Sequence, residues 1–163
     1  MKQKIAFFVN NTYYEQQIDT NLTLLDLLRH NLGLLGTKRG CEKGDCGTCI
    51  VLVDGTPVNA CLYMAVRAKG KKISTVEGLE TDTGLHPLQK SFIEKGAVQC
   101  GFCTPGMLMT GVGLLEQKPF PTEKEVRNAI SGNLCRCTGY QHIVDAVLSA
   151  AEKIGSNTNN ITS

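Results

Sequence analysis

The chain has 163 residues, 42% of them hydrophobic, so it can bury a core as one domain or as two small ones. Its net charge of +2 comes from scattered Lys and Arg residues, which excludes the basic surface typical of nucleic-acid-binding proteins. No apolar run reaches the roughly eighteen residues of a membrane span, and the N-terminus lacks the apolar core and cleavage site of a signal peptide. We therefore expect a cytoplasmic protein without membrane contact, in a reducing compartment where cysteine clusters bind metal or do redox chemistry.

The N-terminal half of the sequence predicts a small domain of strands and one helix. A stripe of leucines predicts the helix over 23–32, with Thr23 as its N-cap. A glycine-rich stretch, 36–47, follows the helix and shows no periodicity. The expected strands, the first two joined at Asn10-Asn11, span 5–9, 12–18, 50–53, 56–59 and 72–76. This order is typical of an α+β sheet crossed by one helix.

After about residue 77 the pattern changes from strands to helices. Thr104 followed by Pro105 predicts a helix start, and Thr122 opens a capping box that ends at Glu125. The expected helices span 87–94, 104–117, 122–132 and 140–154. The apolar side chains around Met107 fit a bundle core better than a cofactor contact.

The change of pattern predicts two domains, 1–77 and 78–155. The segment 66–85 carries glycines among charged residues and threonines, and it is the expected linker. The polar tail, 156–163, is expected to be disordered.

Eight cysteines fall into two groups of four, with none left over. The first group opens with the Cys-x4-Cys-x2-Cys spacing of plant-type 2Fe–2S ferredoxins and consists of Cys41, Cys46, Cys49 and Cys61. Backbone N–H groups must converge on the inorganic sulfides of such a cluster, and glycine allows this because it adopts positive φ angles without side-chain bulk. The glycines beside or between these cysteines are Gly40, Gly44 and Gly47. A structural zinc site is the alternative, although paired Cys-x2-Cys knuckles are usual there.

The second group consists of Cys100, Cys103, Cys135 and Cys137. Both pairs precede expected helices, the second one capped by Thr138, and a helix N-terminus favours thiolates and an anionic cluster. The Cys-x-Cys pair is unsuited to a zinc knuckle. The Cys-x2-Cys-x2-Cys run of a 4Fe–4S centre is missing from the sequence, as are suitably placed histidines for a Rieske centre. We expect a second 2Fe–2S centre, and hence a chain that carries electrons.

Three segments together resemble the iron–sulfur subunit of molybdenum hydroxylases, the xanthine dehydrogenase and aldehyde oxidoreductase family. They are GCEKGDCGTC at 40–49, QCGFCTPG at 99–106 and GNLCRCTGY at 132–140. The resemblance covers about residues 4–154. It implies an N-terminal β-grasp plant-type ferredoxin domain followed by an all-α four-helix-bundle domain that binds the second 2Fe–2S cluster. Thr48 and Ile50 stand where many members have Ala and Thr, which affects no cysteine.

The same resemblance implies an electron-transfer subunit of a heteromeric enzyme, without a substrate site or catalytic residue on this chain. A molybdenum–molybdopterin centre on a large subunit would hydroxylate the substrate with oxygen from water. Two electrons would then pass through the helical-domain cluster and the β-grasp cluster to FAD on a third subunit. Gln99 would hydrogen-bond the pterin, and Cys137 would contact the pterin amino group while it ligates iron.

Two other classes of function stay open at this stage. One is a free-standing two-cluster ferredoxin that serves diffusible partners, and the other is a zinc-stabilised interaction module. Arg136, between two cysteines, fits either a role beside the cluster or a structural ion pair. The three histidines, His30, His86 and His142, are explained by positions on helix surfaces or at helix starts.

Overall fold

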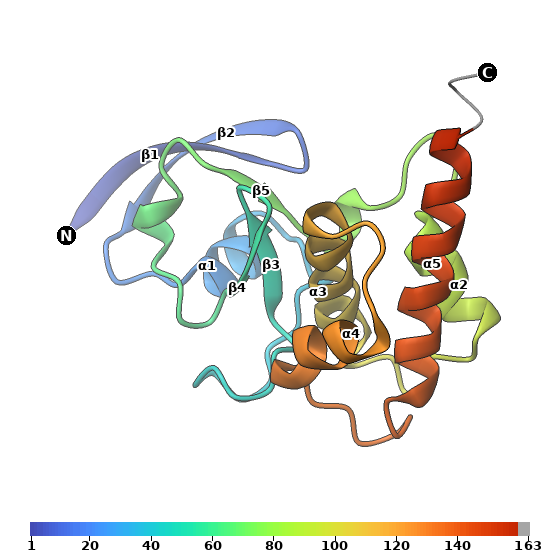
Figure 1. Cartoon of the computed structure of the whole chain (residues 1–163). Coiled ribbons are helices and arrows are strands. Elements are labelled where there is room, and N and C mark those ends of the chain that lie inside the picture. Colours follow the sequence, from blue (N-terminus) through green and yellow to red (C-terminus); the bar gives the residue numbers. More distant parts are fainter. Residues whose placement is uncertain (160–163) are drawn as a thin grey trace.

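A computed structural model of the chain describes residues 1–159 (Figure 1). The elements follow in the order β1 Lys2–Val9, β2 Thr12–Asp19, α1 Leu24–Asp26, η1 Leu27–Asn31, β3 Ile50–Val53, β4 Thr56–Asn59, η2 Ala65–Ala68, β5 Lys72–Ser74, η3 Val76–Gly78, α2 Pro87–Glu94, α3 Thr104–Gln117, α4 Glu123–Ala129, η4 Ile130–Gly132 and α5 Gln141–Asn159. The expected α+β class, a ferredoxin-like sheet followed by a helical domain, is confirmed. Within residues 1–159, no helix has both the length and the apolarity that a membrane span requires.

The five strands form one mixed sheet in the order β2-β1-β5-β3-β4. β1 and β2 make the expected hairpin, and Asn10 and Asn11 adopt positive φ angles of 49° and 66° at its turn. β5 pairs in parallel with β1 and antiparallel to β3, and its Ile73 is buried. The strand expected over 72–76 is therefore present as β5, although it is shorter. It lies inside the segment 66–85, so part of the expected linker is a structural element of the sheet.

The helix expected over 23–32 is short and changes its hydrogen-bond pattern. Thr23 is the N-cap as predicted, because its hydroxyl accepts a hydrogen bond from the backbone N–H of Asp26 at 3.1 Å. After α1 the chain continues as the π-helix η1, in which the N–H of Leu32 donates to the carbonyl of Leu27 at 3.1 Å. The leucine stripe packs beneath the sheet and comprises Leu24, Leu25, Leu27 and Leu28.

Strand β3 is buried on both faces and thereby joins the two halves of the molecule. Val51 and Val53 point into the core of the sheet domain, whereas Ile50 and Leu52 belong to the core of the helical domain. This alternation follows from the two-residue period of a strand. Helix α3 lies against this face of the sheet, with α2 and α5 on its far side (Figure 1).

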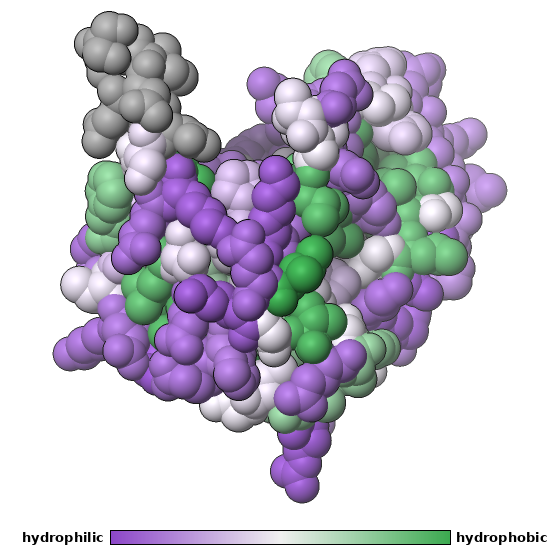
Figure 2. Space-filling view, turned by 90° about the vertical axis from the view of Figure 1, so that its right-hand side faces the viewer, coloured by the Kyte–Doolittle hydropathy of each residue, from purple (hydrophilic) through white to green (hydrophobic). Residues whose placement is uncertain are grey.

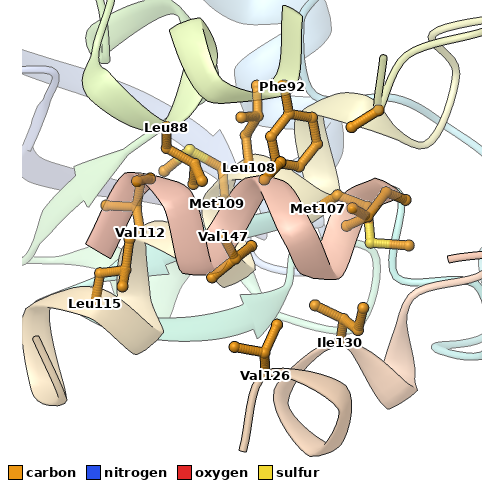
Figure 3. Packing of buried hydrophobic residues seen from close by; sticks show 14 of the residues in the cluster. Leu88, Phe92, Met107, Leu108, Met109, Val112, Leu115, Val126, Ile130 and Val147 are labelled. Atoms are coloured by element: carbon orange, nitrogen blue, oxygen red, sulfur yellow. The ribbon is translucent and has the colours of Figure 1, made fainter. Parts of the chain in front are cut away.

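The four expected helices are all present, and their apolar faces form one core (Figure 3). Met107 is buried there, as the sequence predicted. The capping box is confirmed, since the backbone N–H of Thr122 donates to the carboxylate of Glu125 at 2.7 Å and the N–H of Glu125 donates to the Thr122 hydroxyl at 3.4 Å. Thr104 is the first helical residue of α3 rather than its cap, a position that Cys103 takes. On the side that carries α2 and α5, hydrophobic patches lie between hydrophilic ones (Figure 2).

The last helix extends beyond its predicted end. α5 continues through Asn159, so residues 156–159 are helical where the sequence predicted a disordered tail. Contacts before this segment hold the helix in place: Lys153 forms an ion pair with Glu94, and a Cβ at Gly155 would overlap the ring of Phe120. Residues 160–163 of the expected tail lie outside the described residues.

Candidate metal centres

The loop between η1 and β3 surrounds the first cysteine group with backbone N–H groups. The Sγ atom of Cys41 accepts hydrogen bonds from Lys43, Asp45 and Cys46 at 3.5, 3.3 and 3.4 Å. These bonds, led by those of Lys43 and Cys46, lower the pKa of the Cys41 thiol to about 6. The structure thus shows the convergent N–H groups that an anionic iron–sulfur cluster requires.

Glycine is needed in this loop for two different reasons. Gly47 has a φ of +66°, and a Cβ there would overlap the carbonyl oxygen of Gly132. Gly40 has no positive φ, but a Cβ there would lie 2.9 Å from the Sγ of Cys46. The loop therefore needs both an unusual backbone conformation and close approach of the chain to the thiols.

The other two thiols of the first group come from the ends of strands. Cys49 directly precedes β3, Cys61 follows β4, and both are buried. Burial raises the pKa of Cys49 to about 12. Without a metal the Cys49 side chain stays a protonated thiol at neutral pH. A bound metal cation would deprotonate it, because coordination to a metal removes the proton of a thiol.

In the second group, hydrogen bonds hold Cys135 in the loop ahead of α5. Its backbone N–H donates to the hydroxyl oxygen of Tyr140 at 2.9 Å, and its Sγ lies 3.1 Å from the hydroxyl of Thr138. Burial pushes the pKa of Cys135 upward, but the side-chain and backbone hydrogen bonds from Thr138 outweigh it and leave the pKa below its usual value. At Cys103, where burial dominates, the pKa rises to about 12.

Thr138 does not cap the last helix, contrary to the prediction. Gly139 and Tyr140 have φ angles of +65° and +70°, so two residues in left-handed conformation separate Thr138 from the start of α5 at Gln141. The Thr138 hydroxyl accepts a hydrogen bond from the N–H of Tyr140 at 3.3 Å and contacts Cys135. Cys135 and Cys137 therefore lie in a tight loop rather than in the first turn of the helix.

Within each group the thiols lie in pairs. The Sγ atoms of Cys100 and Cys137 are 3.6 Å apart, close to the roughly 3.8 Å that two thiolates would span at metal–sulfur distances near 2.3 Å. The other interacting pairs are Cys103 with Cys135, Cys41 with Cys46, and Cys49 with Cys61. Among residues 1–159 no three potential ligands are placed to hold a single ion. Pairs of thiols suit a diiron centre, in which each iron takes two thiolates, better than one tetrahedral zinc.

The outer pair of the second group lies at the protein surface. Cys100 and Cys137 are exposed, and so is Gln99 beside them. Two large apolar side chains flank this pair, Phe102 at 50% and Leu134 at 57% exposure. A hollow of about 210 Å³ there is lined by Cys100, Phe102, Cys103, Leu134, Cys135, Arg136 and Cys137. Arg136 makes no ion pair with any residue of the described chain. The structure therefore does not support a structural ion pair as the role of Arg136.

The two groups are connected through contacts that no sequence pattern predicts. The N–H of Leu134 donates to the carbonyl of Cys46 at 2.9 Å, which joins one ligand segment to the other. The side chain of Asn133 is buried and donates to the Gly47 carbonyl at 3.1 Å. The hydroxyl of Thr48 donates to the Phe102 carbonyl at 2.8 Å. Residues this far apart in the chain leave no local signal of their contact.

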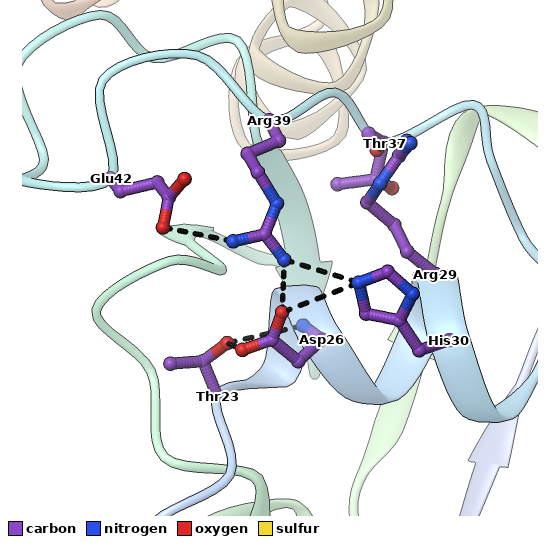
Figure 4. A network of polar contacts seen from close by, with 7 residues as sticks. All are labelled: Thr23, Asp26, Arg29, His30, Thr37, Arg39 and Glu42. Atoms are coloured by element: carbon purple, nitrogen blue, oxygen red, sulfur yellow. Dashed lines mark hydrogen bonds and ion pairs between the residues drawn. The ribbon is translucent and has the colours of Figure 1, made fainter.

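A polar network fixes the first cysteine loop to the helical segment below it (Figure 4). Arg39, two residues before Cys41, forms an ion pair with Asp26 of α1 and another with Glu42 at 2.8 Å. Burial pushes the pKa of Asp26 upward, but hydrogen bonds from Thr23 and Arg39 outweigh it and lower the pKa overall. Arg39 thus holds the loop against α1.

Replacing Asp26 with Asn should loosen this connection. We expect Asp26→Asn to lower the free energy of unfolding by about 1–2 kcal/mol, because a charged hydrogen-bond acceptor is lost. Iron bound by the first cysteine group should also be removed faster by a chelator. Asp19→Asn, at the exposed end of β2, is the matched control. Equal rates of iron loss in the two variants would show that Arg39 does not anchor the loop.

Two separate sets of paired thiols, each receiving hydrogen bonds from backbone N–H groups, are joined to one another by further hydrogen bonds. This arrangement defines an electron-transfer protein with two 2Fe–2S centres. Sequence comparison agrees. Residues 7–82 match the family described as 2Fe-2S iron-sulfur cluster binding domain, and residues 75–148 match the 2Fe-2S binding domain family.

Comparison with individual proteins shows which family of iron–sulfur proteins the chain resembles. It is 51% identical over 148 residues to the nicotine 6-hydroxylase small subunit of Paenarthrobacter nicotinovorans, over 91% of this chain and 89% of that one. The structure matches quinoline 2-oxidoreductase from Pseudomonas putida 86 with a TM-score of 0.90 and 45% identity, over 95% of this chain and 97% of that one. It also matches aldehyde oxidoreductase from Desulfovibrio gigas, with a TM-score of 0.91 and 41% identity, over 95% of this chain but 17% of that longer one.

The chain belongs to the molybdenum hydroxylase family, as the iron–sulfur subunit that carries electrons. This confirms the resemblance seen in the three cysteine motifs. It also confirms the predicted cofactors of this chain, two 2Fe–2S clusters.

Proposed function

We propose that this chain relays electrons from a molybdopterin centre on a large partner subunit to FAD on a third subunit. The group of Cys100, Cys103, Cys135 and Cys137 would receive them, and the group of Cys41, Cys46, Cys49 and Cys61 would pass them on. The clusters supply one-electron redox chemistry when bound. This chain contributes the thiolates, the N–H groups around them and the contacts between the two sites.

The surface around Cys100 and Cys137 carries this proposal. One thiol pair of the second group is exposed, while its other pair, Cys103 and Cys135, packs against the helical core. Exposed Phe102 and Leu134 beside the outer pair favour burial against a protein partner, because contiguous apolar surface marks interaction sites. In the aldehyde oxidoreductase match, the equivalent module is part of a much longer chain. A lasting association therefore explains this surface better than a free-standing ferredoxin does.

The roles of Gln99 and Cys137 belong to this proposal. Gln99 is exposed next to Cys100, and its amide offers both donors and an acceptor to the edge of a pterin. Cys137 is also exposed, and its sulfur lies 3.6 Å from that of Cys100. In the complex it would contact the amino group of the pterin while it ligates iron. We assign no catalytic residue to this chain.

Gln99→Leu provides a test of this site in the assembled complex. We expect the iron–sulfur centres to be reduced by substrate at least about fivefold more slowly, the equivalent of one lost hydrogen bond, while reduction by dithionite is unchanged. Gln17→Leu, on the exposed part of β2, is the matched control. Stopped-flow absorption measures both rates. If Gln99→Leu and Gln17→Leu behave alike, Gln99 has no role at the pterin.

Size-exclusion chromatography of the native protein distinguishes a subunit of a larger complex from a free-standing two-cluster ferredoxin. Co-elution with a molybdenum-containing large subunit and a flavin subunit is the expected result. Elution as a single small chain with both clusters would instead identify a free-standing ferredoxin.

We propose two further assignments. The first is a cytoplasmic location, because eight cysteines grouped as cluster ligands, with no disulfide among the described residues, fit a reducing compartment. We also propose that residues 1–77 and 78–155 are two domains that act as one unit, because β3 contributes to the cores of both.

A further inference from the structure

Thr48 occupies a special position between the two cysteine groups. It lies between Cys46 and Cys49, and only 3% of its surface is exposed. Its hydroxyl donates a hydrogen bond of 2.8 Å to the backbone carbonyl of Phe102. Phe102 directly precedes Cys103 in the sequence. A single side chain of the first ligand segment thus contacts the backbone of the second.

A second contact between the ligand segments involves only backbone atoms. The N–H of Leu134, the residue before Cys135, donates to the carbonyl of Cys46 at 2.9 Å. The same face packs so closely that a Cβ at Gly106 would overlap the carbonyl oxygen of Gly47. A side-chain substitution cannot remove the Leu134 bond, because backbone atoms make it, and replacing Asn133 would break its bonds to both Gly47 and Thr110. The Thr48 hydroxyl can be removed by itself.

We propose that Thr48 is a positioning residue for electron exchange between the two iron–sulfur sites. Its hydroxyl fixes the Cys46–Cys49 segment against the residue before Cys103, which holds the two sites at one separation and orientation. The exchange moves one electron from one site to the other, and no bond or proton on Thr48 changes. This inference rests on the proposed function only in requiring both sites to hold clusters.

The bond between the Thr48 hydroxyl and the Phe102 carbonyl should stabilise the junction against local opening. Without the hydroxyl, the Phe102 carbonyl loses its donor inside a well-packed junction. Loss of one such bond raises the equilibrium for local opening by about fivefold or more. The Leu134 N–H, at the neighbouring contact, reports this opening directly because hydrogen exchange requires its bond to Cys46 to break.

Two substitutions at Thr48 separate the hydroxyl from the shape of the side chain. Thr48→Val keeps the volume and removes the donor, whereas Thr48→Ser keeps the donor. Thr75→Val is the control, because Thr75 is also fully buried and hydrogen-bonded through its hydroxyl, but its partners are Asn10 and Glu77. The complex with both clusters is used throughout. The readouts are amide exchange of Leu134, the EPR splitting between the two reduced centres, and the rate of electron exchange between them.

In Thr48→Val we expect exchange of the Leu134 amide to accelerate about fivefold, the EPR splitting to weaken or broaden, and electron exchange to slow. Thr48→Ser should restore all three, and Thr75→Val should change none of them. An unaltered splitting and rate in Thr48→Val overturns the inference, as does an equal change in Thr75→Val. Iron analysis distinguishes the two failures: absent clusters in the wild type would defeat the proposed function, whereas full clusters with no effect of Thr48→Val defeat only this inference.

Discussion

Serine in place of Cys49 is expected to eliminate the first iron–sulfur centre and leave the second intact. Cys49 is buried and pairs with Cys61, so its loss leaves one iron with a single thiolate from this chain. Iron and acid-labile sulfide should each fall from about four to about two per chain, and one of two reduced-state EPR signals should vanish. Because metal binding contributes to folding, the loop 36–47 should also lose protection against hydrogen exchange.

The reciprocal variant, Cys103→Ser, serves as the control for this experiment. It should remove the other EPR signal and keep the first, since the hydrogen bonds that join the two cysteine segments come from backbone atoms and from the side chains of Thr48 and Asn133, and not from the thiols. If either single substitution removed all the iron, the eight thiols would form one interdependent site, and the assignment of two separate centres would be wrong.

Alanine in place of Gly106 is expected to destabilise the protein strongly, although it lies inside helix α3. In an unhindered helix, Gly→Ala stabilises by about 1 kcal/mol. Here a Cβ would overlap the carbonyl oxygen of Gly47 and lie 3.0 Å from the Cα of Thr48, both rigid backbone atoms. We expect a loss of about 3 kcal/mol or more in the free energy of unfolding, as for severe overpacking, together with partial loss of both clusters.

A nearby glycine provides the comparison for Gly106. A Cβ at Gly132 would meet no atom within 4 Å, and its φ is not positive. Gly132→Ala should therefore change the stability by about 0.5 kcal/mol or less. Chemical unfolding of the cluster-loaded chain measures both variants. A Gly106→Ala chain as stable as Gly132→Ala would mean that the two domains do not pack as described.

The features that the sequence predicted correctly are those whose residues lie close together in the chain. The Cys-x4-Cys-x2-Cys spacing with its glycines identified the first site, because all but one of its ligands lie within nine consecutive residues. The hairpin at Asn10-Asn11 and the Thr122 capping box were predictable for the same reason. The second site was harder, since its two cysteine pairs lie on separate segments.

Long-range features left no trace in a single sequence. The pairing of Cys100 with Cys137 depends on how two loops meet, and the bond from Thr48 to Phe102 joins residues 54 positions apart. The strand over 72–76 was predicted, and it is present as β5, but its central place in the sheet was not predictable, because it depends on pairing with β1 and β3, which lie far away in the sequence. The sequence suggested Thr138 as a helix cap, but the positive φ angles of Gly139 and Tyr140 separate it from the helix, and its hydroxyl contacts Cys135 instead. A non-glycine residue with a positive φ, such as Tyr140, has no recognisable sequence pattern here.

Metal analysis combined with EPR of the anaerobically prepared native protein shows whether the eight thiols hold two diiron centres. We expect about four iron and four sulfide per chain, reddish-brown absorption, and two distinct signals after reduction with dithionite. A colourless protein that contains stoichiometric zinc, or that takes up no electrons from dithionite, would contradict it.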